Sequence, residues 1–488
     1  MAIAPRATAL GVLVATGTGV LTVLAFPPVG LWPLVVLVPV PLLVAQHALL
    51  PPRRSWLAPA VGLATFVAAH FSLGLRDGEV GVVYQLFPLY AGALAGGLGR
   101  RSRDRHARTG YRWFLVAGPV LWVALDFLRS SASETFGGTF AFGAYALWDH
   151  PLLLQPVSVL GIHALDLLLF SAGWVVAGAV LVRLGVPVPH VRRGASIVVA
   201  LTLAWVGTSV ALMDDAPRTL RVAAIQTGVE RGADDWEERY RRDVEQTRDA
   251  ARQGAQLVVW NEVGLQLDPR VERTDELRAL ARETGVHLAI GYGFEDDQGR
   301  RHNEVLLLAP DGEILGTYGK DHPGTFAGDY SETGGTYPVY DTELGTIATI
   351  ICYDLDFTDT ARKMARRGAQ VIATPSADVP SLAYTHFTHL VFRAIENRVS
   401  MVKADNEFDS AVIDPWGRVV AKATAYDGGL QATLVTDVPL GAADSPWVRY
   451  GDWFGWVTVV AAVAVLLFLR RSVPAPGLDL RKNDQDQA

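Results

Sequence analysis

The most prominent pattern along the chain is a series of long apolar stretches separated by polar turns. A helix needs about 20 apolar residues to cross roughly 30 Å of hydrocarbon, and eight stretches approach or reach this length. Seven of them precede residue 214, and one lies near the end of the chain. The pattern therefore predicts eight membrane-spanning helices, at residues 7–26, 31–50, 56–75, 80–98, 113–128, 159–182, 195–213 and 453–469.

Between the seventh and eighth stretches the pattern changes to that of a water-soluble α/β domain. Short apolar runs rich in β-branched residues, which predict strands, alternate there with longer helical patterns. This rhythm favours sheets packed together with helices on the outside, an αββα layered sandwich. The expected helices are 238–252, 273–284, 359–367 and 385–397. The expected strands are 220–225, 256–260, 287–292, 304–308, 314–318, 346–351, 370–374, 400–404, 410–413 and 431–435.

The two patterns together predict the domain organisation. We expect a seven-span transmembrane domain at 1–217, the α/β domain at 218–438, an eighth transmembrane helix within 439–471, and a tail at 472–488. Basic residues follow the even-numbered spans and mark the cytoplasmic side. We therefore expect both termini in the cytoplasm and the α/β domain outside it.

Composition narrows the classes of protein to which the chain can belong. Hydrophobic residues make up 50% of the chain and charged residues 19%, and the modest formal net charge of −7 argues against nucleic acid as a partner. The single cysteine excludes an intramolecular disulfide and argues against a cysteine-based metal site. The sequence shows no metal-ligand spacing and no phosphate-cradling glycine motif, so we expect no metal and no cofactor.

Three reactive side chains stand at the ends of predicted strands. Cys352 ends an apolar run, and Glu262 and Lys320 each follow another. A cysteine nucleophile needs a base, because an unperturbed thiol of pKa about 8.5 is only a few per cent thiolate at neutral pH. Glu262 can act as that base, and Lys320 can stabilise the thiolate and then an oxyanion. Taken singly, the cysteine reads as a small buried hydrophobe and the other two as solvated turn residues.

The order glutamate, lysine, cysteine at three strand ends resembles the nitrilase superfamily. The string Arg-Ala-Ile-Glu-Asn-Arg at 393–398 and the turn within 411–418 are similar to that family's closing helix and hairpin. The resemblance covers residues 218–438. It implies a nitrilase-like fold in which Glu262, Lys320 and Cys352 are the catalytic residues of amide or acyl chemistry.

A nitrilase-like domain between seven membrane spans and an eighth resembles the apolipoprotein N-acyltransferase family. Residues 26–34 look like that family's first hairpin, and residues 126–129, 143–145 and 151–155 are similar to its loop between spans five and six. The resemblance implies a multi-pass protein of the cell inner (cytoplasmic) membrane. It also implies a ping-pong route, in which Cys352 takes an acyl chain from a phospholipid donor as a thioester. The acyl chain then passes to the α-amino group of a diacylglyceryl-modified lipoprotein acceptor.

The sequence departs from the family pattern around the expected acyl pocket. Asn261 stands where the family more often has proline, and Asp354 stands where glutamate is common. Asp329 is the best match to a supporting glutamate, and residues 374–380 lack a tryptophan that relatives often carry. The residues expected to support the triad or to line the pocket are Asp329, Tyr353, Asp354, Trp260 and Asn261.

Two other functions stay open at this stage. A membrane-anchored amidase would use the same triad, with water in place of the amine. A non-catalytic membrane scaffold would keep the fold but would not need a thiol at a strand end. We expect the acyltransferase, working as a monomer, and we interpret His322 and His386 as surface or supporting residues.

Overall fold

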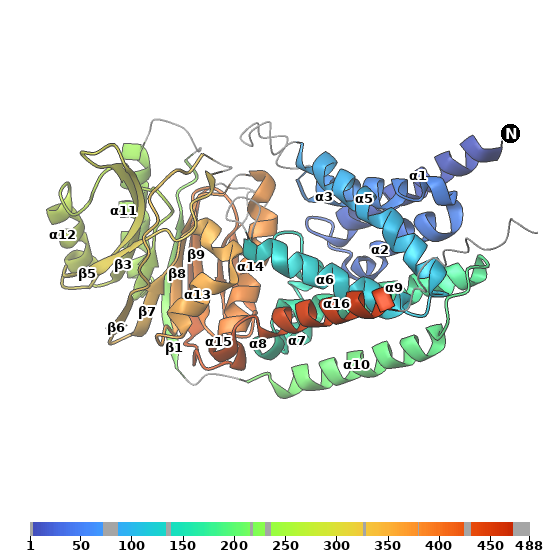
Figure 1. Ribbon diagram of the computed structural model, residues 1–488. Coiled ribbons are helices and arrows are strands. Elements are labelled where there is room, and N and C mark those ends of the chain that lie inside the picture. The colour runs from blue at the N-terminus through green and yellow to red at the C-terminus, as the bar shows by residue number, and fades with distance from the viewer. Residues whose placement is uncertain are drawn as a thin grey trace, which may run out of the picture.

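The computed structural model describes residues 3–71, 86–132, 138–214, 218–229, 236–325, 328–378, 380–423 and 431–471. Two parts of the molecule lie side by side (Figure 1). One part consists of long helices, coloured blue to cyan together with the green α10 and the red α16. The other contains the sheets and their covering helices.

The helical part holds six helices that are long and apolar enough to cross a membrane, counted over the described residues. They lie near six of the eight expected positions. Neighbouring helices pack as α1 on α3, α3 on α5, α2 on α9, and α6 on α9 and α16. The helices and helical turns of this part are α1 (Ile3–Ala25), η1 (Trp32–Leu37), α2 (Pro39–Val44), η2 (Ala45–Leu49), η3 (Pro52–Arg54), α3 (Leu57–Phe71), α5 (Phe87–Arg108), α6 (Phe114–Ala132), η4 (Gly143–Leu147), α7 (Pro151–Leu154), α8 (Val157–Leu160), α9 (Ile162–Arg183), α10 (Val191–Ala211) and α16 (Trp453–Arg471).

The other two expected spans differ from the structure. Helix α3 covers the third only as far as Phe71, and the rest of that span lies outside the described residues. Helix α5 begins at Phe87 and continues to Arg108, so the fourth span, expected at 80–98, is displaced toward the C-terminus. The helix continues past the apolar stretch because arginine and alanine are good helix formers. The basic segment that we expected to follow this span is therefore the last turns of α5.

Two six-stranded sheets form the α/β part, in the orders β12-β1-β2-β3-β4-β5 and β11-β10-β9-β8-β7-β6. Each contains three consecutive parallel strands, β1-β2-β3 and β7-β8-β9. The connectivity thus repeats, although the sequence shows no internal repeat. The strands are β1 (Thr219–Gln226), β2 (Leu257–Val259), β3 (His287–Glu295), β4 (Arg301–Leu308), β5 (Ile314–Gly319), β6 (Val339–Thr342), β7 (Gly345–Thr349), β8 (Val371–Ser376), β9 (Ser400–Asp405), β10 (Ser410–Ile413), β11 (Val419–Ala423) and β12 (Ala432–Pro439).

The sequence pattern did not predict the edge strand β6, which is only four residues long and half-buried. A short edge strand with a polar residue in it carries too little apolar periodicity to be recognised.

Alternation of side chains along the strands separates the layers. Val222 and Val259 belong to the core between the two sheets, whereas Ala223 and Val258 face the opposite side of the first sheet. That outer face is covered by α11 (Trp236–Arg252) and α12 (Thr274–Thr284). Because successive residues of a strand point to opposite faces, both faces of the sheet are apolar and both are covered.

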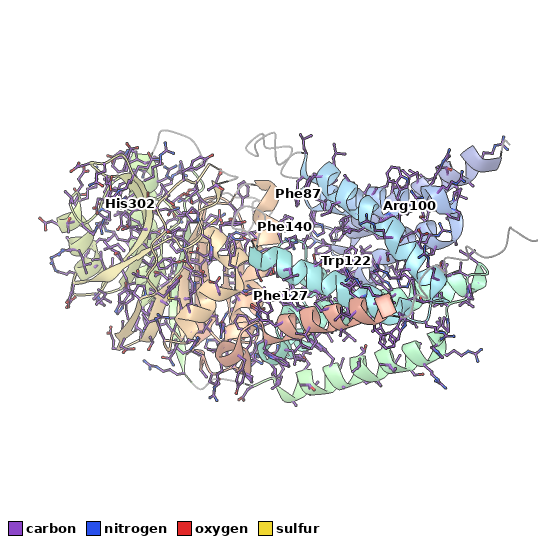
Figure 2. All side chains as sticks on the ribbon, in the orientation of Figure 1. Phe87, Arg100, Trp122, Phe127, Phe140 and His302 are labelled. Carbon is purple, nitrogen blue, oxygen red and sulfur yellow. The ribbon has the colours of Figure 1, made fainter. Side chains whose placement is uncertain are left out.

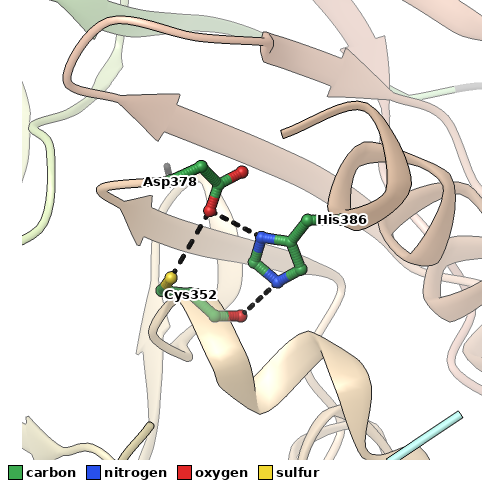
Figure 3. A group of neighbouring side chains, drawn as sticks. All are labelled: Cys352, Asp378 and His386. Atoms are coloured by element: carbon green, nitrogen blue, oxygen red, sulfur yellow. Dashed lines mark hydrogen bonds and ion pairs between the residues drawn. The ribbon is translucent and has the colours of Figure 1, made fainter. Parts of the chain in front are cut away.

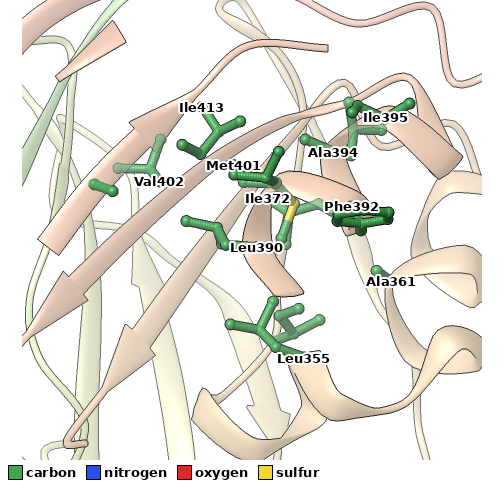
Figure 4. Close-up of a cluster of buried hydrophobic side chains, with 14 of the residues drawn as sticks. Leu355, Ala361, Ile372, Leu390, Phe392, Ala394, Ile395, Met401, Val402 and Ile413 are labelled. Atoms are coloured by element: carbon green, nitrogen blue, oxygen red, sulfur yellow. The ribbon is translucent and has the colours of Figure 1, made fainter. Parts of the chain in front are cut away.

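Helices α13 (Thr358–Ala365) and α14 (Pro380–Asn397) cover the second sheet and complete the αββα order. Figure 4 shows Leu390 of α14 against Ile372 of β8 and Met401 of β9, all of them completely buried. Burial of such a side chain contributes about 1.5–3 kcal/mol. The sandwich is therefore a rigid frame for the strand ends.

Helix α14 also joins the two parts of the molecule, because it contacts η4 and α8. Just after it, Arg398 Nη1 donates to Gln155 Oε1 at 2.6 Å. The Thr139 backbone N–H donates to the Asp356 carbonyl oxygen at 2.6 Å. Since Asp356 closes the short helix η6 (Cys352–Asp356), the helical part directly holds the turn that begins with Cys352.

Candidate active site

Cys352 lies where strand β7 gives way to η6. Its φ of 42° falls in the left-handed region, which costs a non-glycine residue about 1–3 kcal/mol. Asp354 holds this turn: its Oδ2 accepts from the Ile351 backbone N–H at 2.8 Å and from the Tyr318 hydroxyl at 2.7 Å. The turn points the Cys352 side chain into a cavity.

Glu262 follows strand β2 and is only 8% exposed. Its backbone N–H donates to the Ser376 carbonyl oxygen at 3.2 Å, which ties the end of β2 to the end of β8 in the other sheet. Gly291 of β3 makes this approach possible, because a Cβ there would lie 2.2 Å from the Asn261 carbonyl oxygen. The Glu262 carboxylate thus faces the same cavity as the thiol.

Lys320 follows strand β5 and makes two ion pairs through its ammonium group. Its Nζ lies 2.7 Å from Glu262 Oε1 and 2.8 Å from Asp329 Oδ2. Asn303 of β4 donates through Nδ2 to the same Glu262 oxygen at 2.7 Å. The structure therefore brings Glu262, Lys320 and Cys352 together from three strand ends in two sheets.

These charges set the state of the thiol. Burial raises the pKa of the Cys352 thiol well above its usual value, the Glu262 carboxylate raises it further, and the Lys320 ammonium acts in the opposite sense. Burial disfavours the charge on Lys320, but Glu262, Cys352 and Asp329 raise its pKa well above the usual value. At neutral pH the group holds a protonated thiol beside a charged lysine, so the cysteine needs a base to become a nucleophile.

A second polar cluster lies beside the sulfur atom (Figure 3). Asp378 Oδ1 accepts from Cys352 Sγ at 3.5 Å and lies 2.7 Å from His386 Nδ1. The other ring nitrogen, His386 Nε2, lies 2.9 Å from the Cys352 carbonyl oxygen. Both ring nitrogens therefore face acceptors, which is the hydrogen-bonding pattern of a protonated imidazolium.

The charges of this cluster balance one another. Lys403 Nζ lies 3.0 Å from Asp378 Oδ2. Burial disfavours the Asp378 carboxylate, but His386 and Lys403 outweigh burial and lower its pKa. Asp378 in turn outweighs burial and raises the pKa of His386. At neutral pH Asp378 is therefore a carboxylate next to the nucleophile.

One cavity of about 1900 Å³ is lined by Glu262, Lys320, Cys352, Asp378 and His386 and continues into the helical part. It passes Phe140 and Trp122 and follows α5 from Phe87 to His106. Figure 2 labels Phe87, Trp122 and Phe140. Ordinary small-molecule pockets enclose roughly 300–1,000 Å³. The walls between the helices are mostly apolar, so the cavity fits a long apolar ligand whose reactive end reaches Cys352.

Three of the expected supporting residues lie at the site. Tyr353 and Asp329 line the cavity. Burial alone would raise the pKa of Asp329, but Lys320 and Ser331 outweigh it and lower this pKa to about 2. Asp354 is fully buried under the nucleophile turn, where its Oδ1 accepts from the backbone N–H of His322 at 2.8 Å.

The other two expected pocket residues do not line the cavity. Strand alternation turns Trp260 to the outer face of its sheet, where Nε1 donates to Thr247 Oγ1 at 2.8 Å. Asn261 is fully buried, and its Nδ2 donates to Thr227 Oγ1 at 3.3 Å. Both residues belong to the framework rather than to the pocket, whereas Glu262, the next residue along the chain, lines the cavity.

The sequence reasoning missed Asn303, Asp378 and Lys403 and gave His386 only a minor place. Asp378 follows strand β8 directly, which is the same signal that identified Glu262. Lys403 stands between two apolar residues of a strand and is completely buried, and a buried charge requires a partner. Asn303 has no such signal, because it stands in the polar run at the start of β4, and polar residues of a strand normally face solvent.

Among the residues that the structure describes, two groups of side chains bring metal-ligand atoms within 4.8 Å of one another. One is Cys352 with Asp378 and His386, whose atoms already bind one another. In the other group Asp321 and Asp359 each pair with Lys363 Nζ, at 3.2 and 2.6 Å, and His322 lies between them. These internal partners account for both groups without a cation.

Comparisons with known proteins match both parts of the chain. Residues 221–445 match the family model described as carbon-nitrogen hydrolase. Residues 18–175 match the model described as the apolipoprotein N-acyltransferase N-terminal domain. An apolipoprotein N-acyltransferase of Geobacter metallireducens is 26% identical over 519 residues, which cover 94% of this chain and 96% of that protein.

Two further similarities each cover less than half of this chain. An omega-amidase of Homo sapiens is 30% identical over 224 residues, which cover 40% of this chain and 80% of that protein. Among solved structures, an amidase of Nesterenkonia sp. is 22% identical, with a TM-score of 0.41, over 49% of this chain and 98% of that one.

Proposed function

This chain belongs to the carbon-nitrogen hydrolase family of the nitrilase superfamily and carries the N-terminal domain of apolipoprotein N-acyltransferases, and on this premise we propose its reaction. It moves a fatty acyl chain from a phospholipid, through a thioester on Cys352, to the α-amino group of the N-terminal diacylglyceryl-cysteine of apolipoproteins. The cavity that joins Cys352 to the apolar interior of the helices carries the proposal. A small amide needs no such extension, whereas an acyl chain is stabilised by apolar walls.

In the first half-reaction Glu262 takes the Cys352 thiol proton as the sulfur attacks the ester carbonyl carbon of the phospholipid. Lys320 Nζ, which already lies 2.7 Å from Glu262, stabilises the oxyanion that forms. The carbon–oxygen bond then breaks, and Glu262 returns the proton to the departing lysophospholipid oxygen. The acyl chain remains on Cys352 as a thioester.

In the second half-reaction a neutral amine attacks the thioester carbonyl carbon. Glu262 takes one amine proton as the carbon–nitrogen bond forms and delivers it to the sulfur as the carbon–sulfur bond breaks. The products are the amide and the free thiol. Because the first product leaves before the second substrate reacts, steady-state kinetics should be ping-pong.

We extend the proposal to the arrangement in the membrane. The divisions are the membrane domain 1–217, the catalytic domain 218–438, the last span within 439–471 and the tail 472–488, which lies outside the described residues. The basic end of α5 marks the cytoplasmic side. The catalytic domain of the monomer then faces outward from the inner membrane, where lipidated substrates enter sideways.

Single cysteines placed in a Cys352→Ala background test this orientation, because the chain has no other cysteine. Asp341→Cys on β6 should react with a membrane-impermeant maleimide in whole cells whose outer membrane has been permeabilised. Arg108→Cys at the end of α5 should react only after the inner membrane has been opened. The reverse pattern would overturn the orientation.

The reaction itself is tested by the mass of the purified protein after incubation with phospholipid, beside Cys352→Ala. We expect a fatty-acyl increment on the Cys352 peptide, absent from the variant and discharged by a diacylated lipopeptide that becomes acylated. Release of free fatty acid without acylated lipopeptide would favour an amidase-like hydrolase. No adduct on folded protein with several phospholipids would favour a scaffold.

A further inference from the structure

We infer that Asp378 binds the amino group of the acyl acceptor, and that His386 positions Asp378 for this role. The inference rests on the proposed function and assigns a carboxylate to its second half-reaction. Asp378 lines the catalytic cavity and is 7% exposed, so a ligand reaches its carboxylate through the cavity. The ligand class is a primary amine, which a buried carboxylate accepts as a hydrogen-bond donor.

The geometry places this carboxylate at the reacting atom. Asp378 Oδ1 lies 3.5 Å from Cys352 Sγ and accepts the thiol hydrogen in the resting protein. An acyl carbonyl carbon bonded to that sulfur lies about one bond length away from it. An amine nitrogen that donates a hydrogen to Oδ1 is therefore within attacking distance of the carbonyl carbon.

Acylation of Cys352 creates the vacancy that the amine fills. The thioester sulfur carries no hydrogen, so Asp378 Oδ1 loses one of its two donors when the first half-reaction is complete. A buried carboxylate with an unfilled acceptor position is unfavourable, and a donor that arrives there is bound more tightly than in the resting protein. Loss of the thiol donor thus makes the acceptor amine bind more tightly to the acylated protein than to the resting protein.

One oxygen of Glu262 already accepts two hydrogen bonds, so we assign the binding of the amine to Asp378. Its Oε1 accepts from Lys320 at 2.7 Å and from Asn303 at 2.7 Å. The division of labour balances the protons of a neutral amine. One N–H hydrogen passes through Glu262 to the sulfur as the carbon–sulfur bond breaks. The other hydrogen stays covalently bound to nitrogen, donates a hydrogen bond to Asp378, and remains on the amide nitrogen of the product.

His386 holds Asp378 in place from the far side. Its Nδ1 lies 2.7 Å from Asp378 Oδ1, and its Nε2 lies 2.9 Å from the Cys352 carbonyl oxygen and 3.3 Å from Asp356 Oδ2. Lys403 holds the second Asp378 oxygen at 3.0 Å. The imidazole thus links the carboxylate to the backbone of the nucleophile, which makes His386 a positioning residue.

Asp378→Asn and Asp378→Ser test the inference when the two half-reactions are measured separately. Each variant is first loaded with acyl chain from phospholipid, and the Cys352 adduct is followed by intact mass. We expect loading within about threefold of the wild-type rate, since the variants keep Glu262 and Lys320, which act in that step. Discharge by a diacylated lipopeptide should then fall at least 30-fold. Discharge by hydroxylamine, a small strong nucleophile that needs no binding carboxylate, should be unchanged.

Matched variants distinguish the loss of the Asp378 contact with the amine from the loss of any negative charge in the cavity. Glu295→Gln, at the end of β3, removes another carboxylate that lines the cavity, and it should not slow lipopeptide discharge selectively. His386→Gln, which keeps a side chain able to donate to Asp378, should retain more discharge activity than His386→Phe. The difference should appear mainly as a higher lipopeptide concentration at half-maximal rate.

The outcomes are distinguishable from failure of the proposed function. If wild-type protein forms no thioester, the acyltransfer proposal itself is wrong. If wild-type loads and both folded Asp378 variants discharge to lipopeptide at the wild-type rate, the inference is overturned. It is also overturned if both folded variants fail to load, or if Glu295→Gln loses discharge to the same extent.

Discussion

Lys320 Nζ lies 2.7 Å from Glu262 Oε1, although 58 residues separate the two along the chain. Each residue is almost completely buried, so neither charge could persist there alone. The pair is the electrostatic centre of the site. It places a carboxylate and an ammonium in the same cavity as a thiol whose own pKa is raised.

Replacing Lys320 by methionine should abolish most acyl loading of Cys352. The variant keeps the apolar stem but leaves Glu262 and Asp329 as two carboxylates without their shared cation. Loss of one oxyanion-stabilising group typically reduces the rate by about 10²–10³-fold. Single-turnover loading from phospholipid measures this, with Lys363→Met, which removes an ammonium outside the triad, as the control. Loading at the wild-type rate in Lys320→Met would contradict the assigned role.

The pH dependence of thiol alkylation should move in opposite directions in two variants. Besides burial, the Glu262 carboxylate raises the pKa of Cys352 and the Lys320 ammonium lowers it. Glu262→Gln should therefore shift the rise of the iodoacetamide rate to lower pH, and Lys320→Met should shift it to higher pH. Mass spectrometry reads the adduct without ambiguity, because Cys352 is the chain's single cysteine. Shifts of the same sign in both variants would show that these charges do not control the thiol.

Asp354→Ala should destabilise the catalytic domain as well as the site. Asp354 accepts from the Ile351 and His322 backbone N–H groups and from the Tyr318 hydroxyl. Each buried donor left without an acceptor costs about 1–3 kcal/mol. We expect a lower thermal melting midpoint and reduced loading, measured in the same detergent or nanodisc preparation. An unchanged midpoint would show that the turn does not depend on this carboxylate.

Asp354 should also leave a signature in the dependence of stability on pH. Burial raises its pKa in the folded protein to about 6, above the value of about 3.9 in an unfolded chain. Its contribution to stability is therefore fully present below about pH 4 and is lost as the pH rises to 6. The difference in melting midpoint between wild-type protein and Asp354→Asn should follow this course. A difference that stays constant from pH 4 to 7 would contradict it.

A bulky residue inside the cavity should restrict long acyl donors. Ala95 on α5 lines the cavity, whereas the exposed Ala93 on the same helix does not. Ala95→Trp should slow loading from a long-chain phospholipid about tenfold or more and affect a short-chain donor less, because overpacking excludes atoms from the cavity. Ala93→Trp is the matched control. Equal behaviour of both variants would place the acyl chain elsewhere.

Local pattern was enough to predict most elements of the fold. Over the described residues, the apolar stretches placed six helices that are long and apolar enough to cross a membrane. The β-branched runs placed ten of the twelve strands described, with an eleventh implied by the turn near residue 414. Burial of one face of a segment makes its apolar residues recur at a regular spacing, and this spacing can be recognised in a sequence. The displaced α5 and the unrecognised β6 are the exceptions, since in them apolar pattern and secondary structure do not coincide.

The sequence by itself determined the layered domain between membrane helices and the three residues at strand ends, because strand ends and reactive side chains are local features. Only the tertiary structure decided the rest. It turned Trp260 away from the pocket, brought Asp378 and His386 beside Cys352, and joined the site to the cavity between the helices. These relationships depend on the packing of two sheets and on contacts across the chain. The side chains involved are separated by tens or hundreds of residues, so no local pattern encodes their distances.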